Sequence, residues 1–227
     1  MSAADVSESV LSSAVSKSLW IPGAPLGEAS LIVVSNAERE NLSLKLFDSD
    51  GAVANTLTVE LAKFPAVVSL EMLVAGIKRD SGFKHGQVQV QHSSSAVVTV
   101  HMHSNASAVT LPSPTELIPG ANFFMPVSFG ANKTPLLTLT NGGEQEAVIK
   151  LRLFCGNRMP ELMVSIPPHG SRVVALGTEF SEYTAFSADK EVHGYVRLHM
   201  KSDGAVGVGF LEVNGSTAAD AIFSVVR

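Results

Sequence analysis

Charged residues and cysteine are scarce in this chain of 227 residues. Asp, Glu, Lys and Arg make up only 16% of it, against about 25% in an average protein. The formal net charge is −5 and no long run of Lys or Arg occurs, which argues against a nucleic-acid partner because phosphate backbones require concentrated positive charge. Cys155 is the single cysteine. The chain can therefore form no internal disulfide, which fits a reducing compartment.

Long apolar runs are missing as well. No stretch approaches the roughly 20 residues of a membrane-spanning helix, and the first residues lack the basic and continuous apolar segments of a secretory signal. We therefore expect no membrane insertion and a cytoplasmic location. Apolar residues nevertheless make up 45% of the chain and its mean hydropathy is positive. Either the core is large or a partner covers part of an apolar surface.

Short alternating segments bounded by turn residues dominate the chain, as is typical of β-strands. In the segment LTVEL, Leu57, Val59 and Leu61 fall on one face and the polar residues between them on the other, which predicts a half-buried strand. Helix signals are few, and the clearest is a short helical turn within 68–80. The pattern therefore indicates an all-β protein.

Segments of the first half recur in the same order in the second half, roughly 100 residues later. The matching pairs are 20–22 with 124–126, 31–51 with 136–157, 57–70 with 162–176, and 85–100 with 193–208. The last pair aligns without a gap. We therefore predict two tandem antiparallel β-sandwich units related by internal duplication.

The unit boundaries follow from composition. Three prolines and no alternation mark 105–120 as a connection. The predicted organisation is an N-terminal arm at 1–18, a first sandwich at 19–108, a linker at 109–122 and a second sandwich at 123–227. The residues predicted to line the two cores are Val88, Val90, Val98, Val100 and Met102 in the first unit, and Val196, Leu198, Val206, Val208 and Phe210 in the second.

Four of the seven histidines lie within 85–104, HGQVQVQHSSSAVVTVHMHS. If 93–95 forms a hairpin loop, His85 faces His103 across the two strands, and His101 shares their face. Three imidazoles at that distance could bind zinc, nickel or copper. His85, His101 and His103 are thus the candidate metal ligands of the sequence.

The same face of this hairpin favours a surface interpretation over a metal site. It also carries Gln87, Gln89 and Thr99, which indicate a polar, solvent-facing sheet, and it offers no Asp or Glu to orient a ligating imidazole. His92 falls on the opposite, inward face. We therefore predict no bound metal and no cofactor.

Catalytic motifs are absent from the sequence. It contains no nucleophile elbow, phosphate-binding loop, zinc-protease motif or dinucleotide fingerprint. Cys155 has no activating base beside it in the sequence. FDSDGAV at 47–53 has too few ligands for a calcium loop and predicts a hairpin turn, as does NGG at 141–143. We predict that the protein is not an enzyme and has no catalytic residues.

Each half resembles the small β-sandwich of the sensory rhodopsin transducer family. The shared features are Trp20 near the start, LIVVSN leading to a strand that ends in LFDSDG, the strand pair LTVELAKFPAVVSL, and the closing segment VQVQHSSSAVVTVHM. The second half keeps this order but lacks the tryptophan. The resemblance implies a non-enzymatic, oligomeric protein that acts by binding others, and it supplies no catalytic residue.

These patterns predict a non-catalytic structural or scaffold protein that self-assembles through protein–protein contacts. We expect the terminal segments 1–18 and 220–227 to dock on a neighbouring subunit, because open sheet edges accept an added strand. A soluble adaptor of the transducer type, binding a receptor or regulator, is one alternative. A carbohydrate- or metal-binding module is the other.

Overall fold

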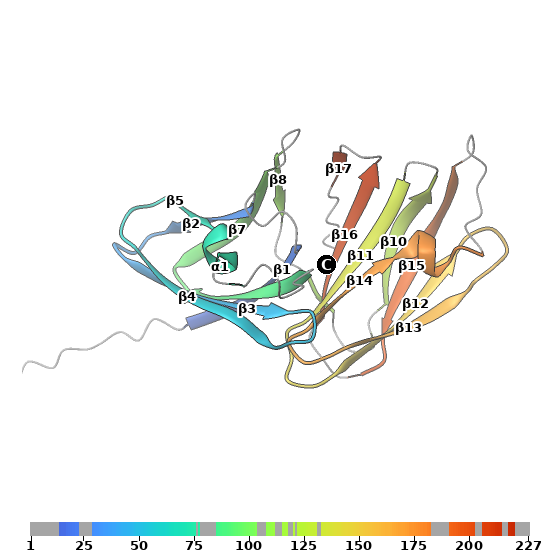
Figure 1. Ribbon diagram of the computed structural model, residues 1–227, viewed down its shortest axis with the longest axis horizontal. Coiled ribbons are helices and arrows are strands. Elements are labelled where there is room, and N and C mark those ends of the chain that lie inside the picture. Colours follow the sequence, from blue (N-terminus) through green and yellow to red (C-terminus); the bar gives the residue numbers. More distant parts are fainter. Residues whose placement is uncertain are drawn as a thin grey trace, which may run out of the picture.

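The computed structural model describes residues 14–22, 29–75, 77, 85–103, 108–111, 115–117, 120, 122–130, 133–182, 191–202, 206–214 and 218–220. These residues are mostly β-strand, arranged as two β-sandwiches that lie side by side (Figure 1). The all-β prediction is confirmed.

Two antiparallel four-stranded sheets form the first sandwich, with strand orders β1-β6-β3-β4 and β5-β2-β7-β8. A single helical turn, α1, follows β5 and confirms the helical signal within 68–80. The elements are β1 Ala14–Pro22, β2 Ala29–Ser35, β3 Glu40–Asp48, β4 Val53–Leu61, β5 Ala66–Ser69, α1 Glu71–Val74, β6 His85–Ser93, β7 Ala96–His103 and β8 Ala108–Leu111.

The second sandwich has the strand orders β10-β15-β12-β13 and β14-β11-β16-β17, and a short strand β9 also pairs with β16. Its elements are β9 Thr115–Leu117, β10 Asn122–Phe129, β11 Lys133–Asn141, β12 Ala147–Phe154, β13 Glu161–Ile166, β14 Ser171–Ala175, α2 Leu176–Glu179, β15 Val192–Met200, β16 Val206–Asn214 and β17 Ala218–Asp220.

The two units share one strand order, element for element from β1 and β10 onward. Their registers agree as well, since Leu46 lies opposite Val88 in the first unit and Leu153 lies opposite Val196 in the second. A duplicated unit would have this correspondence. The duplication itself remains a prediction.

Alternation along the strands builds one apolar core in each sandwich. On β3, Leu42, Leu44 and Leu46 are fully buried, while the residues between them face outward. Burial of such a side chain contributes roughly 1.5–3 kcal/mol. Of the predicted core residues, those whose side chains are described are all buried: Val88, Val90, Val98, Val196, Leu198 and Val206. Val100, Met102, Val208 and Phe210 lie outside the described side chains.

The turn after β3 is the hairpin predicted from FDSDGAV. Asp48 Oδ1 accepts hydrogen bonds from the backbone N–H groups of Asp50 and Ala52, both at 2.9 Å. Gly51 takes a φ of +88°, in the region that glycine enters without steric cost. The turn therefore folds back on itself and presents its backbone outward.

Two predicted boundaries need correction. Strand β1 begins at Ala14 and pairs with β6, so the end of the predicted arm is part of the first sandwich. Strand β8 ends at Leu111 and β9 occupies Thr115–Leu117, so the predicted linker contains strands. Residues 1–13 and 221–227 lie outside the described part of the chain, and the docking of the termini remains a prediction.

The two sandwiches contact each other closely, through a surface that we call the joint. The turn between β3 and β4 enters the turn between β13 and β14. Ser49 O accepts hydrogen bonds from Ser171 N at 3.0 Å and Arg172 Nη1 at 2.9 Å. A Cβ atom on Gly51 would lie 1.9 Å from the carbonyl oxygen of Pro168. Only a residue without a side chain fits this position.

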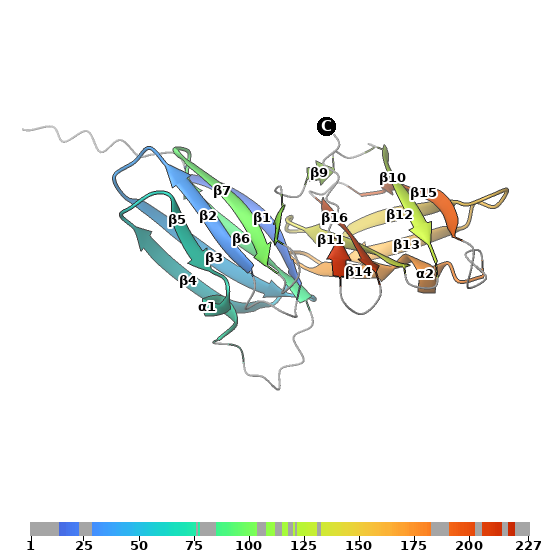
Figure 2. The same ribbon diagram turned by 90° about the horizontal axis from the view of Figure 1, so that it is seen from above.

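Strands β1 and β6 of the first unit extend the joint over β11, β14 and β16 of the second (Figures 1 and 2). Gln87 on β6 is buried there, and its Nε2 donates to Asn141 O at 2.7 Å. The ring of Phe47 stacks on that of His169, with 4.9 Å between centroids. The prediction that Gln87 faces solvent is therefore wrong, because the second sandwich covers it.

Candidate binding surfaces

The histidine hairpin expected from the sequence does not form. Strands β6 and β7 are joined by a turn but belong to different sheets, where β6 pairs with β1 and β3 and β7 pairs with β2 and β8. His85 therefore pairs with Pro22, and His103 with Ala108. The pairing that would bring His85 opposite His103 was wrong. The alternation of residues predicted correctly which face of each strand is buried. It did not predict which strand each one pairs with.

The three candidate ligands are thus separated by the topology. His101 lies on β7, opposite Ser30 on β2, and the side chains of His85 and His103 lie outside the described ones. Among the described residues, no cluster of three His, Cys, Asp or Glu side chains could hold a metal ion. His92 faces inward and is buried, as its alternation predicts.

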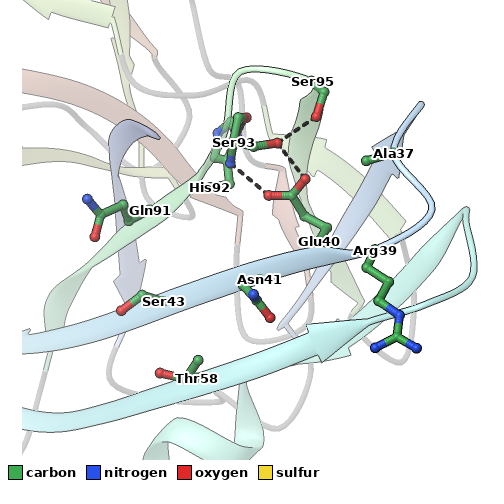
Figure 3. Close-up of a pocket in the computed structure, with 10 residues that line it drawn as sticks. All are labelled: Ala37, Arg39, Glu40, Asn41, Ser43, Thr58, Gln91, His92, Ser93 and Ser95. Atoms are coloured by element: carbon green, nitrogen blue, oxygen red, sulfur yellow. Dashed lines mark hydrogen bonds between the residues drawn. The ribbon is translucent and has the colours of Figure 1, made fainter. Parts of the chain in front are cut away.

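A polar hollow of about 460 Å³ lies at one end of the first sandwich (Figure 3). Ser43 on β3 lines it, and lies opposite Thr58 on β4 and Gln91 on β6. The lining residues are Ala37, Arg39, Glu40, Asn41, Ser43, Thr58, Gln91, His92, Ser93 and Ser95. Hydroxyl and amide groups prevail here. An aromatic ring on which a sugar could stack is not among these residues.

Glu40, His92 and Ser93 bring an acid, an imidazole and a hydroxyl together beside this hollow (Figure 3). The buried carboxylate of Glu40 accepts from Ser93 N at 2.7 Å and Ser93 Oγ at 2.5 Å, and Ser93 Oγ contacts Ser95 Oγ at 2.6 Å. His92 Nδ1 donates to Ser93 O at 2.6 Å. A catalytic relay requires the imidazole to hold the hydroxyl proton. Here the carboxylate takes it, so the group fastens the turn between β6 and β7 to the start of β3.

Cys155 sits at the end of the strand β12, half-buried against the second core. It forms an isolated β-bridge with Arg158. This packing agrees with the structural role expected for a free thiol.

Four apolar side chains lie together on the outside of the sheet β5-β2-β7 in the first unit, beside the polar Ser30, Thr99 and His101. Val34 on β2 lies opposite Val97 on β7, and Ile32 lies opposite Val67 on β5. The side chains of Val34, Val67 and Val97 are 51%, 70% and 59% exposed. We call Ile32, Val34, Val67 and Val97 the valine face. Among the described side chains of these three strands, none that points outward is Asp, Glu, Lys or Arg.

The second unit exposes aromatic rings instead. Tyr195 on β15 is 42% exposed and Phe124 on β10 is 51% exposed. Tyr195 stacks on Phe154 of β12 with 4.5 Å between ring centroids, and lies 5.9 Å from Phe124. We call these three residues the aromatic face. Sequence reasoning missed both faces, although alternation places Val34, Val97 and Tyr195 on outward positions.

No family model matches the chain, and no curated protein resembles it at a significant level. Among the described residues, no helix has the length and apolarity needed to cross a membrane. Only the geometry of the structure therefore supports the candidate surfaces.

Proposed function

We propose that the protein is a non-catalytic structural or scaffold subunit that acts through protein–protein contacts, and that its copies join head to tail. The observation that supports this most is the joint. Each chain already contains one contact between two sandwiches of the same strand order. The two surfaces that correspond to the sides of this joint remain open, one on each unit.

The receiving side of the joint is the outside of the sheet β14-β11-β16. Thr138 and Thr140 point outward on β11, yet they are only 1% and 2% exposed because the first unit covers them. Leu31 on β2 faces the first core as Leu137 and Leu139 on β11 face the second, so Ile32 lies on the same outer face as Thr138 and Thr140. The valine face is thus the same surface in the first unit, with nothing covering it within the described chain.

The entering side of the joint includes Phe47 and Gln87, which lie opposite each other on β3 and β6. The same positions in the second unit are Phe154 and Tyr195, which lie opposite each other on β12 and β15. In the first unit these positions are buried in the joint, whereas Tyr195 is exposed. The aromatic face therefore corresponds to the side that enters.

These two open faces complement each other chemically. Both are apolar, and burying apolar area is favourable by about 25 cal/mol per Å². A contact between the aromatic face of one copy and the valine face of the next copy would leave one face free at each end. Such a heterologous contact produces a growing chain unless the rotation closes a ring.

Val97→Lys is expected to weaken self-association roughly tenfold or more, because a lysine in the centre of an apolar contact must lose its hydration. Val53→Lys is the control, since Val53 is 52% exposed on β4 and lies outside the valine face. Sedimentation velocity over a concentration series measures the effect. Equal loss in both variants, or no concentration-dependent association of the unmodified protein, would contradict the proposal.

A mixing experiment separates a head-to-tail contact from a symmetric one. Val97→Lys disables the valine face and Tyr195→Glu disables the aromatic face, so neither variant alone should assemble. Their mixture should form a one-to-one complex and stop there, because each copy supplies the one intact face that the other lacks. A Tyr195→Glu variant that dimerises alone would point to a symmetric valine contact. A closed oligomer of the unmodified chain would favour an adaptor over a growing scaffold.

A further inference from the structure

Five basic side chains gather on the outer surface of the second sandwich, next to the aromatic face. They line a hollow of about 180 Å³ that contains no acidic lining residue. Lys150 and Arg152 come from β12, Arg197 and His199 from β15, and Lys201 follows the end of β15. This concentration occurs in a chain whose net charge is −5, so composition alone does not reveal it.

The pairing of β12 with β15 sets these basic groups directly against one another. Arg152 lies opposite Arg197, and Lys150 lies opposite His199. Like charges at directly opposed positions of antiparallel strands are destabilising. The opposed pair Arg152 and Arg197 thus bears an electrostatic cost that an anion bound between the two strands would reduce.

Glu161 on β13 compensates only part of this charge. Its carboxylate accepts from Lys150 Nζ at 2.5 Å and from Arg152 Nε at 2.6 Å. The hydrogen bond from Lys150, followed by that from Arg152, holds the pKa of Glu161 below its ordinary value. One carboxylate therefore forms ion pairs with two cations at the edge of the cluster, and it stays ionised at neutral pH.

Arg197 is held in place by neutral groups. Its Nε donates to Asn122 Oδ1 at 2.8 Å, and its guanidinium carbon lies 6.0 Å from the centroid of the Phe124 ring. A guanidinium oriented in this way offers its remaining N–H groups as a preformed fork. Beside it, His199 Nδ1 is buried and finds no partner among the described residues.

We propose that this hollow binds a phosphate group or a comparable divalent oxyanion of a small molecule. The arginine fork and the lysine ammonium groups are the donors that recognise phosphate oxygens in proteins. Anion binding at this hollow does not require self-assembly, although Phe124 of the aromatic face also lies beside Arg197.

Isothermal titration at neutral pH, with inorganic phosphate, pyrophosphate and glycerol phosphate as probes, tests the site. Sodium chloride keeps the ionic strength equal, because screening alone weakens exposed charge interactions. Saturable binding of at least one probe is expected. Arg197→Gln should weaken it about tenfold, as expected for one charge-assisted contact, while Lys63→Gln in the first unit changes the charge equally and should have no effect.

Glu161→Gln should strengthen binding of the same probe severalfold. The substitution keeps the shape of the side chain and releases Lys150 and Arg152 for the ligand. A residue with a purely structural role would not produce this gain, so the variant decides the question even if Arg197→Gln folds poorly. No binding to the unmodified protein, equal affinities in Arg197→Gln and Lys63→Gln, or an unchanged affinity in Glu161→Gln would overturn the proposal. The three probes show whether a free or an esterified phosphate is preferred.

Discussion

Replacing Gly51 with alanine is expected to open the joint while leaving both sandwiches folded. The added Cβ would lie 1.9 Å from Pro168 O, closer than any real contact of these atoms, and the obstacle is backbone that cannot rotate away. The turn must withdraw, and the bonds from Ser171 and Arg172 to Ser49 are then lost. The free energy of unfolding should fall by roughly 1–3 kcal/mol from this clash, as in overpacked sites.

Gly156 provides the matched control. It occupies the corresponding turn after β12 and also has a positive φ, +61°, but no atom lies within 4 Å of a Cβ built there. Gly156→Ala therefore carries the backbone cost of the left-handed conformation, about 1–2 kcal/mol, without the clash. The difference between the two variants measures the clash together with the loss of the hydrogen bonds to Ser49.

Two measurements distinguish an open joint from a damaged sandwich. Small-angle scattering should show a more extended Gly51→Ala chain, and its circular dichroism should keep the β-type signal. Denaturant unfolding should separate into two steps, because units that no longer contact each other unfold independently. A single step with the same midpoint as Gly156→Ala would mean that the turns are not what couples the units.

Much of the architecture could be predicted from the sequence because alternation is a local property. Leu57, Val59 and Leu61 pack against the first core while Thr58 and Glu60 stay exposed, as the period of two requires. The turn at Gly51 follows from equally local chemistry.

Strand partners are a long-range property, and there the prediction was wrong. The turn at 93–95 contains residues that suit a hairpin, yet β6 and β7 cross from one sheet to the other. Both arrangements bury Val88, Val90 and Val98. Periodicity therefore cannot distinguish a hairpin from a crossover, and the proposed convergence of histidines depended on that distinction.

The joint escaped prediction in part because polar residues contribute to it. Gln87 and Asn141 look like surface residues in a strand pattern, and both are buried where two folded units meet. The basic hollow escaped for a related reason. Its residues are distant in sequence, and Arg152 and Arg197 come together only through the pairing of β12 with β15.

Asn141, at the end of β11, is the most heavily bonded side chain of the joint. Its Nδ2 donates to Gln145 O at 2.7 Å and to Ile166 O and Pro167 O, both at 3.1 Å, while its Oδ1 accepts from Gly143 N at 2.9 Å. The residue is fully buried. One amide thereby supports the turn after β11 and the turn after β13, the second of which receives Gly51.

Asn141→Ala is expected to lower the free energy of unfolding by roughly 3 kcal/mol, because several buried polar groups lose their partner at about 1 kcal/mol or more each. Asn55→Ala is the graded control. Asn55 Nδ2 donates to one carbonyl, Leu73 O at 2.6 Å, and its Oδ1 accepts from the exposed Thr56 N at 2.8 Å, so its loss should be about 1–2 kcal/mol. Chemical denaturation of both variants gives the comparison. If Asn141→Ala loses no more than Asn55→Ala, water replaces the amide at the orphaned carbonyls. The joint would then depend on the fit of its two turns and not on their polar centre.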